Sequence, residues 1–214
     1  ENFNGDVQIN VSVSDGEYTD SEVFTLTVNP VNDAPVLSET GNQQTSEDTP
    51  LTLTLSAEDI DGDNLTFTAE SSSPVDVSVS VTGDQLTLTP SLNFNGSVDV
   101  TVTVSDLFLT DSETFAITVI PVNDAPVLSQ IGPQYTSEDT PLSIELDALD
   151  VDEDELTFTA ESLSPEFVSV EVDGDLLIMT PDENWTGTVQ ITVTVSDGNL
   201  EDSETFVLSV SGIN

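Results

Sequence analysis

Basic side chains are absent from this sequence. Its 214 residues contain no Lys, Arg or His but 42 Asp and Glu, which gives a formal net charge of −42. Because an ion pair needs a cationic side chain, no Asp or Glu can form one within the chain. Phosphate recognition depends on Lys and Arg, so we expect neither nucleic acid nor an anionic membrane surface as a partner. Water, backbone N–H groups, counter-ions or bound metal must meet the negative charge.

Cysteine is also absent, which excludes disulfides and thiolate metal sites. Without His, Cys, Lys or Arg, the chain cannot build a catalytic triad, a Schiff base or a phosphate clamp, so we do not expect an enzyme. A carboxylate pair of the glycosidase type is formally possible, but no insertion interrupts the sequence pattern to form a cleft. No apolar run approaches the ~20 residues of a membrane helix, so we expect no membrane insertion in this segment.

The chain repeats itself at a fixed offset of 91 residues. This period is too long for a solenoid repeat of roughly 20–50 residues and fits a small independent domain. The matching segments are VNDAPVL at 31–37 and 122–128, TSEDTPL at 45–51 and 136–142, and LTFTAES at 65–71 and 156–162.

The opening of the chain belongs to a third copy of the same pattern. ENFNGDVQINVSVSDG at 1–16 aligns with 92–107 and with 183–198. We therefore predict two complete domains, 31–121 and 122–214. Residues 1–30 precede them as the C-terminal strand hairpin of a repeat that is truncated or completed by another chain.

Within each copy, apolar residues alternate with Thr, Ser or Asp. Leu51, Leu53 and Leu55 alternate with threonines, and the valines of 98–104 do the same. A period of two indicates antiparallel strands with one buried face. Seven short strands in about 90 residues predict an all-β fold of tandem seven-stranded Greek-key β-sandwiches of the Ig type. For the first domain the expected strands are 35–38, 50–57, 64–69, 75–81, 85–89, 97–105 and 112–120.

Each copy also carries three aspartates at alternate positions before a strand. These are Asp59, Asp61 and Asp63 in EDIDGDNLTF, and Asp150, Asp152 and Asp154 in LDVDEDELTF. Carboxylates on so short a loop stay ionised only when a cation or several donors lie among them. Oxygen ligands without His or Cys favour Ca²⁺ or Mg²⁺ over zinc.

An EF-hand loop accounts for part of this spacing. Counting from Asp59 or Asp150, positions 1, 3 and 5 are Asp and position 12 is Glu70 or Glu161. Position 6, which needs Gly, is occupied by other residues, and LTFTAE alternates as a strand where the EF-hand continues into a helix. We therefore favour a metal site built from residues distant in sequence. An acidic surface that is only solvated is the alternative.

Four motifs in order resemble the bacterial cadherin-like tandem repeats of large surface or secreted adhesin-type proteins. VNDAP resembles the cadherin inter-repeat linker, SEDTP the early Glu element, DIDGDN and DVDEDE the Asp-x-Asp loop, and VSD the late Asp. The four motifs occur at 31–35 and 122–126, 46–50 and 137–141, 59–64 and 150–155, and 104–106 and 195–197.

This resemblance implies Ca²⁺ at the junctions between consecutive domains. At the junction of the two complete domains it implies the ligands Glu47, Asn123, Asp124, Asp150, Asp152 and Asp197, with the backbone carbonyl of Ala125. At the junction before residue 31 it implies Asn32, Asp33, Asp59, Asp61 and Asp106. Cadherins carry a Leu-Asp-Arg-Glu element before the penultimate strand. It is missing here, where the corresponding region reads PSLNFNG in the first domain and PDENWTG in the second. We therefore expect one calcium per junction and leave a second open.

The resemblance further implies an elongated rod of sandwiches, stiffened by calcium through contacts with neighbouring repeats. Such a segment would be a structural spacer of a large extracellular bacterial adhesin or surface protein, supporting cell adhesion and biofilm formation. Extracellular Ca²⁺ modules bind with a Kd of roughly 10⁻⁴–10⁻³ M, which suits a cell-surface or secreted protein rather than a cytosol.

Two other functions stay open. A carbohydrate- or partner-binding module would need an exposed aromatic residue, and Phe108 stands in a loop where the other copies have polar residues. A filament subunit would have its leading hairpin, Asp6–Val13 with Glu22–Val28, completed by strand addition from another chain. Homophilic contacts belong to the same group of possibilities.

Overall fold

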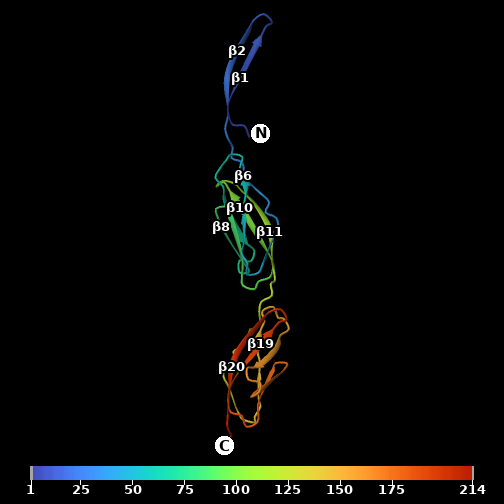
Figure 1. Cartoon of the computed structure of the whole chain (residues 1–214). Helices are drawn as coiled ribbons and strands as arrows, with labels where there is room; N and C mark the ends of the chain where they lie inside the picture. Colours follow the sequence, from blue (N-terminus) through green and yellow to red (C-terminus); the bar gives the residue numbers. More distant parts are fainter. Residues whose placement is uncertain (1, 214) are drawn as a thin grey trace. The chain divides into compact units, whose positions relative to one another are not determined.

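The computed structural model describes residues 2–213, and within this range the protein is all-β with twenty strands and no helix. The described residues accordingly contain no helix that is long and apolar enough to cross a membrane. The chain forms two compact units, Glu1–Pro121 and Val122–Asn214 (Figure 1).

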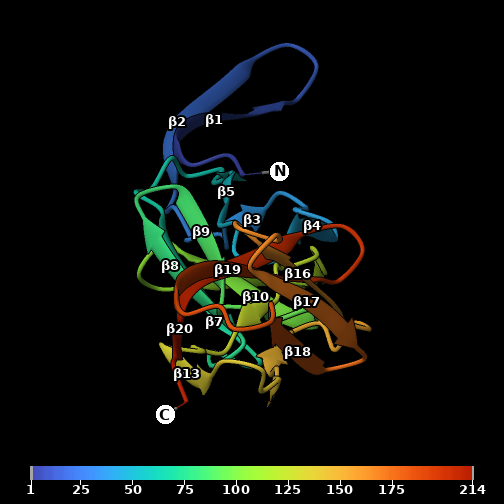
Figure 2. The ribbon, with the colours of Figure 1, turned by 60° about the horizontal axis from the view of Figure 1, so that its bottom comes forward.

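The first unit contains a hairpin and a sandwich. The hairpin pairs β1 (Gly5–Ser14) with β2 (Thr19–Val28) as a two-stranded sheet of its own (Figure 2). The sandwich has a four-stranded sheet in the order β4-β11-β10-β7 and a three-stranded sheet β5-β9-β8, with β3 paired to β6. Its strands are β3 (Val36–Leu37), β4 (Gln43–Ser46), β5 (Leu51–Thr54), β6 (Ala57–Glu58), β7 (Thr66–Ser71), β8 (Val77–Thr82), β9 (Gln85–Pro90), β10 (Gly96–Ser105) and β11 (Thr110–Ile120).

The second unit repeats this topology strand for strand. Its sheets are β13-β20-β19-β16 and β14-β18-β17, with β12 paired to β15. In both units the first strand of the larger sheet runs parallel to the last strand, and the other pairs are antiparallel. The strands are β12 (Val127–Leu128), β13 (Gln134–Ser137), β14 (Leu142–Glu145), β15 (Ala148–Leu149), β16 (Thr157–Ser162), β17 (Val168–Asp173), β18 (Leu176–Pro181), β19 (Gly187–Ser196) and β20 (Glu201–Ser211).

The core of each sandwich comes from the alternation seen in the sequence. Val100, Val102 and Val104 of β10 are fully buried, and the residues between them face outward. Phe115 and Ile117 of β11 meet them from the neighbouring strand. Since one face of each long strand is apolar and the other polar, only one packing of the two sheets buries the apolar faces.

The predicted all-β fold of tandem seven-stranded sandwiches is confirmed, since the two sheets of each repeat together contain seven strands. A short additional pair, β3 with β6 or β12 with β15, brings the number of strands to nine per repeat. The segment 50–57 forms two strands, because β5 pairs with β9 in one sheet and β6 pairs with β3 in another. The additional strand β4 has the sequence QQTS, which lacks apolar alternation and joins the sheet through parallel backbone pairing with β11.

Candidate metal sites

Three loops meet at one end of the first sandwich: the linker 31–35, the loop 59–64 and the turn after β10. The Asn32 Nδ2 donates to Asp106 Oδ2 at 2.7 Å, and it also donates to the carbonyl of Asp33 at 3.2 Å. The backbone N–H of Asp33 donates to Asp61 Oδ2 at 2.8 Å. Residues 74 and 28 positions apart are thus joined in one hydrogen-bond network.

The loop between β6 and β7 is folded by Asp59. Its Oδ1 accepts the backbone N–H of Asp61 at 2.9 Å and that of Asp63 at 3.2 Å. Asp side chains commonly bond the backbone two residues onward in this way. The turn brings one carboxylate oxygen from each of the three aspartates within 4.8 Å of the others. The other carboxylate oxygen of Asp59, Oδ2, is buried and accepts no hydrogen bond from residues 2–213.

The second repeat contains the same arrangement. Asn123 Nδ2 donates to Asp197 Oδ2 at 2.8 Å, and Asp124 N donates to Asp152 Oδ2 at 2.8 Å. Asp150 Oδ1 accepts the N–H of Asp152 at 2.9 Å. Asp150 Oδ2 is again buried without a hydrogen-bond partner in the described residues. Hence the unsatisfied oxygen is a property of the repeat rather than of one loop.

The late aspartate of each repeat has ample hydrogen-bond donors. Asp106 is 2% exposed, and its Oδ1 accepts the N–H groups of Phe108 at 2.7 Å and Leu109 at 2.6 Å. The Leu109 N–H, followed by the Asn32 amide, lowers the pKa of Asp106 below its ordinary value of 3.8. Donors that bond the charged form favour it, so this carboxylate is ionised at neutral pH.

Asp197 has the equivalent environment in the second repeat. The N–H of Leu200 is the main cause that lowers the pKa of Asp197, and the Asn123 amide is the next. In both repeats the Asn amide nitrogen faces the carboxylate, so its carbonyl oxygen is directed away from it. The linker asparagine is therefore held in place through its nitrogen and keeps its oxygen for another partner.

The structure brings together five predicted ligands in each repeat. One network contains Asn32, Asp33, Asp59, Asp61 and Asp106; the other contains Asn123, Asp124, Asp150, Asp152 and Asp197. Glu47 belongs to the first unit, where it follows β4 and its N–H donates to the carbonyl of Ile120 at 2.9 Å, at the end of β11. Its predicted role at the second network stays a prediction.

Two acidic residues were missing from the predicted ligands. Asp63 and Asp154 complete the two carboxylate triads. Their signal in the sequence is the alternation D-x-D-x-D itself, whose third aspartate lies on the same short loop as the first two.

The EF-hand interpretation is excluded by the backbone. The segment that it requires as loop and helix is strand β7 in the first repeat and β16 in the second. Glu70 pairs with Thr101 and Glu161 with Thr192 across the sheet, and both glutamates are exposed on strands. Neither can close a twelve-residue loop around an ion that starts from the first Asp.

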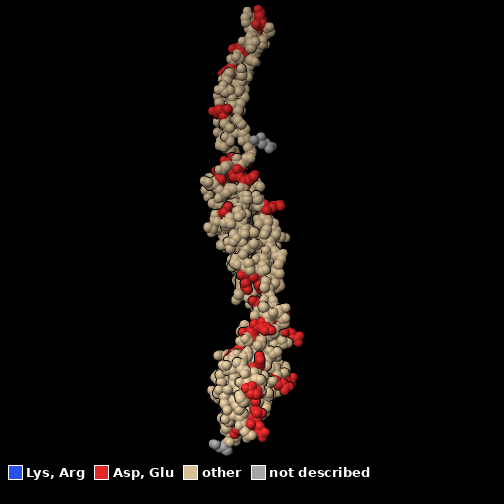
Figure 3. Space-filling view, viewed as in Figure 1, with Lys and Arg blue, Asp and Glu red and all other residues tan. Residues whose placement is uncertain are grey.

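The chemistry of the triads fits a hard cation such as Ca²⁺. All their side-chain ligands are oxygens, which Ca²⁺ and Mg²⁺ prefer. The chain offers no cationic side chain to neutralise them, and Figure 3 accordingly shows red acidic surface and no blue. A buried carboxylate oxygen without a donor is costly, and a bound cation would remove that cost.

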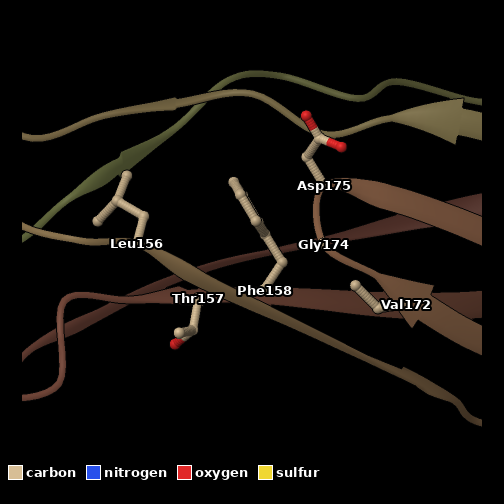
Figure 4. A pocket seen from close by; sticks show the side chains of 6 residues that line it. All are labelled: Leu156, Thr157, Phe158, Val172, Gly174 and Asp175. Atoms are coloured by element: carbon tan, nitrogen blue, oxygen red, sulfur yellow. The ribbon is translucent and has the colours of Figure 1, made fainter.

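A hollow in each sandwich gives no comparable site. In the second repeat it is lined by Leu156, Phe158, Val172 and Asp175, with Thr157 directed to the other side of its strand (Figure 4). Equivalent residues line a hollow in the first repeat. The Phe158 ring packs against the core, so it is not an exposed platform for a ligand.

Comparisons with known proteins agree with the fold. A family model described as Bacterial Ig domain matches residues 32–118 and 123–209. Human protocadherin-24 EC1-2 matches with a TM-score of 0.55 and 19% identity, covering 86% of this chain and 100% of that one. Extracellular cadherin domains 1–5 of protocadherin gamma B2 match with a TM-score of 0.54 and 18% identity, covering 98% of this chain and 46% of that one.

An endo-fucoidan hydrolase of glycoside hydrolase family 107 also matches, with a TM-score of 0.38 and 19% identity over 99% of this chain. The present chain spans 34% of that enzyme, about a third of its length. No curated protein matches the sequence. The protocadherin likeness confirms tandem sandwiches of the cadherin and Ig kind, as the sequence motifs predict.

Proposed function

The chain belongs to the bacterial Ig domain family, and we propose from this premise that it is a calcium-stiffened spacer of a large extracellular bacterial adhesin or surface protein. It keeps consecutive repeats at a fixed spacing, so that other parts of the protein reach their targets in cell adhesion and biofilm formation. Domains of this kind are typically structural rather than enzymatic, and we assign this segment no catalytic activity. Its partners are the neighbouring repeats.

One observation carries the calcium assignment. Asp59 Oδ2 and Asp150 Oδ2 are buried oxygens without hydrogen-bond donors among the described residues, and each lies in a triad of carboxylates. A solvated acidic surface would leave these oxygens to water, whereas here the fold removes them from it. The same orphaned oxygen at equivalent positions of two repeats is what a repeated cation site requires.

Glu47 is the ligand that we propose from the preceding repeat. Its equivalent, Glu138, has an Oε1 that accepts the N–H of Ile213 at 2.8 Å, just after the last strand of the second repeat. The backbone N–H groups of Glu47 and Glu138 likewise bond to the last residue of β11 and β20. The early glutamate thus lies where the chain leaves its repeat, and we assign Glu47 as a ligand of the cation held by Asp150, Asp152 and Asp124.

Calcium would act here by supplying positive charge that the chain lacks. Without it, the aspartates of a junction repel one another and the linker between repeats is free to bend. Chain groups keep the ligands ready, because the Asn123 amide holds the linker to Asp197 and Asp150 folds its own loop. An ion shared between a repeat, its linker and the preceding glutamate would restrict that bending.

Calcium titration by calorimetry, combined with distance measurements between spin labels in the two repeats, tests this function. We expect Asp150→Asn to abolish one binding event and Glu161→Gln to leave both, since Glu161 is exposed on β16. Glu47→Gln should weaken one site and broaden the distance distribution in calcium. Glu138→Gln is its matched control, because Glu138 is the equivalent glutamate of the second repeat and is not a ligand in the proposed site.

Each outcome bears on a different part of the proposal. No calcium binding at millimolar concentration would remove the metal and with it the spacer mechanism. Binding without any change in the distance distribution would keep the metal but refute the stiffening. Equal effects of the Glu47 and Glu138 variants would show that the early glutamate acts inside its own repeat.

A second function has one observation in its favour. Phe108 is 81% exposed and Leu107 is 78% exposed, at a turn where the other copies carry polar residues or Gly. Exposed neighbouring apolar side chains often mark a contact site. A glycan array screened with the native chain and with Phe108→Ser would detect a carbohydrate-binding module through signals that the variant loses.

A further inference from the structure

The second repeat carries a pair of stacked aromatic rings that the first repeat cannot form. The ring centroids of Phe167 and Trp185 lie 5.1 Å apart, and the two ring planes differ by 9°. Aromatic rings at this separation attract each other beyond the area that they bury. At the equivalent positions, 91 residues earlier, the first repeat has Asp76 and Phe94. The stack is therefore a property of one repeat and is not required by the fold.

Trp185 is the inner ring of the pair and Phe167 the outer one. Trp185 is half-buried and packs against the core of the repeat. It also lies close to the backbone of Gly187, where an added Cβ would come within 2.7 Å of the Cζ2 atom of Trp185. Phe167 stacks on this fixed ring and is itself 39% exposed. An exposed ring that is already held in place binds a ligand without the further cost of ordering it.

The turn that carries Phe167 also differs between the repeats in charge. Three of its positions are acidic and exposed in the second repeat but uncharged in the first. They are Glu166, Asp182 and Glu183, equivalent to Val75, Ser91 and Leu92. A backbone bond joins the two halves of the turn, because the N–H of Asp182 donates to the carbonyl of Phe167 at 2.8 Å. The exposed ring and the three carboxylates thus occur together, in the same repeat and at the same turn.

A planar cationic group fits both features. The face of an aromatic ring attracts a cation, and the guanidinium of Arg can also stack flat on the ring. Its N–H groups bond carboxylates in a fork geometry that a Lys ammonium does not provide. The chain contains no Lys or Arg, so no side chain of its own can supply this group. A net charge of −42 also repels acidic partners and attracts basic ones.

We propose that Phe167 is the docking point for an arginine side chain of a basic partner protein. The guanidinium stacks on the exposed face of Phe167, as the next layer after Trp185, and donates hydrogen bonds to the carboxylates of Glu166 and Asp182. The partner is a polypeptide with exposed arginines and not another copy of this chain, which has none. This site goes beyond the spacer function, because it needs neither calcium nor a neighbouring repeat.

The first test adds a blocked peptide of alternating Arg and Gly to the whole chain. A buffer with ~10 mM Ca²⁺ and ~150 mM NaCl occupies cation sites and screens unspecific attraction. Trp185 is the only Trp of the chain, so its fluorescence reports on the stack. We expect a saturable change in this emission, with an affinity at least about threefold higher than for a matched peptide of Lys and Gly. Equal affinity for the two peptides would overturn the recognition of a guanidinium.

The substitution Phe167→Asp separates the ring from the charge. It introduces the residue of the first repeat, where Ser73 Oγ donates to Asp76 Oδ2 at 2.6 Å, and the second repeat keeps this serine as Ser164. The variant is more negative, so attraction by charge alone would strengthen, whereas loss of the ring should weaken binding at least about threefold by calorimetry. Unchanged or tighter binding would overturn the proposal. Phe167→Tyr keeps the ring and should bind the Arg peptide as the native chain does.

A pair of charge variants keeps the test decisive if Phe167→Asp does not fold. Asp182→Ser and Asp173→Thr each remove one exposed carboxylate and introduce the residue of the first repeat, Ser91 or Thr82. Asp173 is the last residue of β17, whereas Phe167 lies just before the first. We expect Asp182→Ser to weaken binding of the Arg peptide about threefold and Asp173→Thr to leave it unchanged. Equal effects of the two variants would refute a site at this turn.

A sugar is the competing ligand for an exposed aromatic ring. If the ring serves as a sugar platform, neutral oligosaccharides on a glycan array will bind the native chain and Phe167→Tyr but not Phe167→Asp. That result, together with an Arg peptide that does not bind, would assign the ring to carbohydrate and refute the proposed occupant.

Discussion

Calcium should raise the thermal stability of the two sandwiches, and the size of the effect follows from the number of sites. Each repeat holds one carboxylate triad with one buried oxygen that lacks a donor among the described residues. With a Kd of roughly 10⁻⁴–10⁻³ M, one ion adds about 1.4–2.7 kcal/mol per repeat at ~10 mM Ca²⁺. Since ~1 kcal/mol moves the melting temperature of a domain of this size by about 4–8 °C, we expect a rise of about 6–22 °C over EDTA.

The assay has to separate binding from charge screening. A chain of net charge −42 is stabilised by any salt that weakens its self-repulsion, so the melts belong in a background of ~150 mM NaCl. Magnesium at the same concentration is the ion control, because it gives up its water reluctantly and demands octahedral geometry. Calorimetry and circular dichroism report the two transitions independently of dye binding.

The decisive variant is the double substitution Asp59→Asn and Asp150→Asn. An Asn retains the Oδ1 that accepts the N–H groups of the loop, as Asp59 does for Asp61 and Asp63, and it removes the charge of the buried oxygen. We expect this variant to fold in EDTA and to lose the calcium shift. A shift of equal size in the variant, or an equal shift with magnesium, would refute the assignment of the triads as calcium sites.

Three further predictions concern the fold itself. Leu107 adopts φ of 87°, where the other two copies have Gly, so Leu107→Gly should add about 0.5–1 kcal/mol to the unfolding free energy in urea. Phe115→Ala should cost about 3–5 kcal/mol in the same assay, because the ring is 3% exposed, whereas Phe24→Ala should cost less than ~1 kcal/mol at 49% exposure. The Tyr18 N–H is the main cause that lowers the pKa of Asp15 below 3.8. The stabilisation from this bond is therefore present above pH 3.8 and is lost as the pH falls through the pKa of Asp15 in the folded state. A ¹³C titration of the Asp15 carboxyl should show the lowered pKa.

The long strands of each sandwich could be predicted from the sequence because burial on one face imposes a period of two. Val98 to Val104 and Phe115 to Val119 carry that period without interruption, and they became β10 and β11. The strand β4 could not be predicted, since QQTS is polar and short, and its place depends on backbone pairing with β11. When a strand is held by backbone pairing with its neighbour, its own sequence need not show an apolar alternation.

The candidate sites were predictable for a different reason. The spacing D-x-D-x-D reveals the loop of Asp59, but the bond between Asn32 and Asp106 joins residues 74 positions apart. Residue chemistry alone does not select that pair, and it was reached through the resemblance of VNDAP and VSD to cadherin-like motifs. The left-handed conformation of Leu107 has its signal in the other copies, which carry Gly16 and Gly198 at the equivalent position of the turn.

In a chain without a cationic side chain, backbone N–H groups take over the role that ion pairs have elsewhere. Asp111 and Glu113 accept such groups from Leu37 and Thr40 and thereby attach the segment around β3 to the last hairpin of the repeat, while Asp106 accepts those of its own turn. The fold thus supplies donors to these three carboxylates, of which Asp106 is also a predicted ligand. Asp59 Oδ2 and Asp150 Oδ2 are the exception, because the fold buries them and the described residues offer them no donor. The acidic residues can therefore be sorted by their donors, and that sorting, rather than the density of negative charge, is what selects the candidate cation sites.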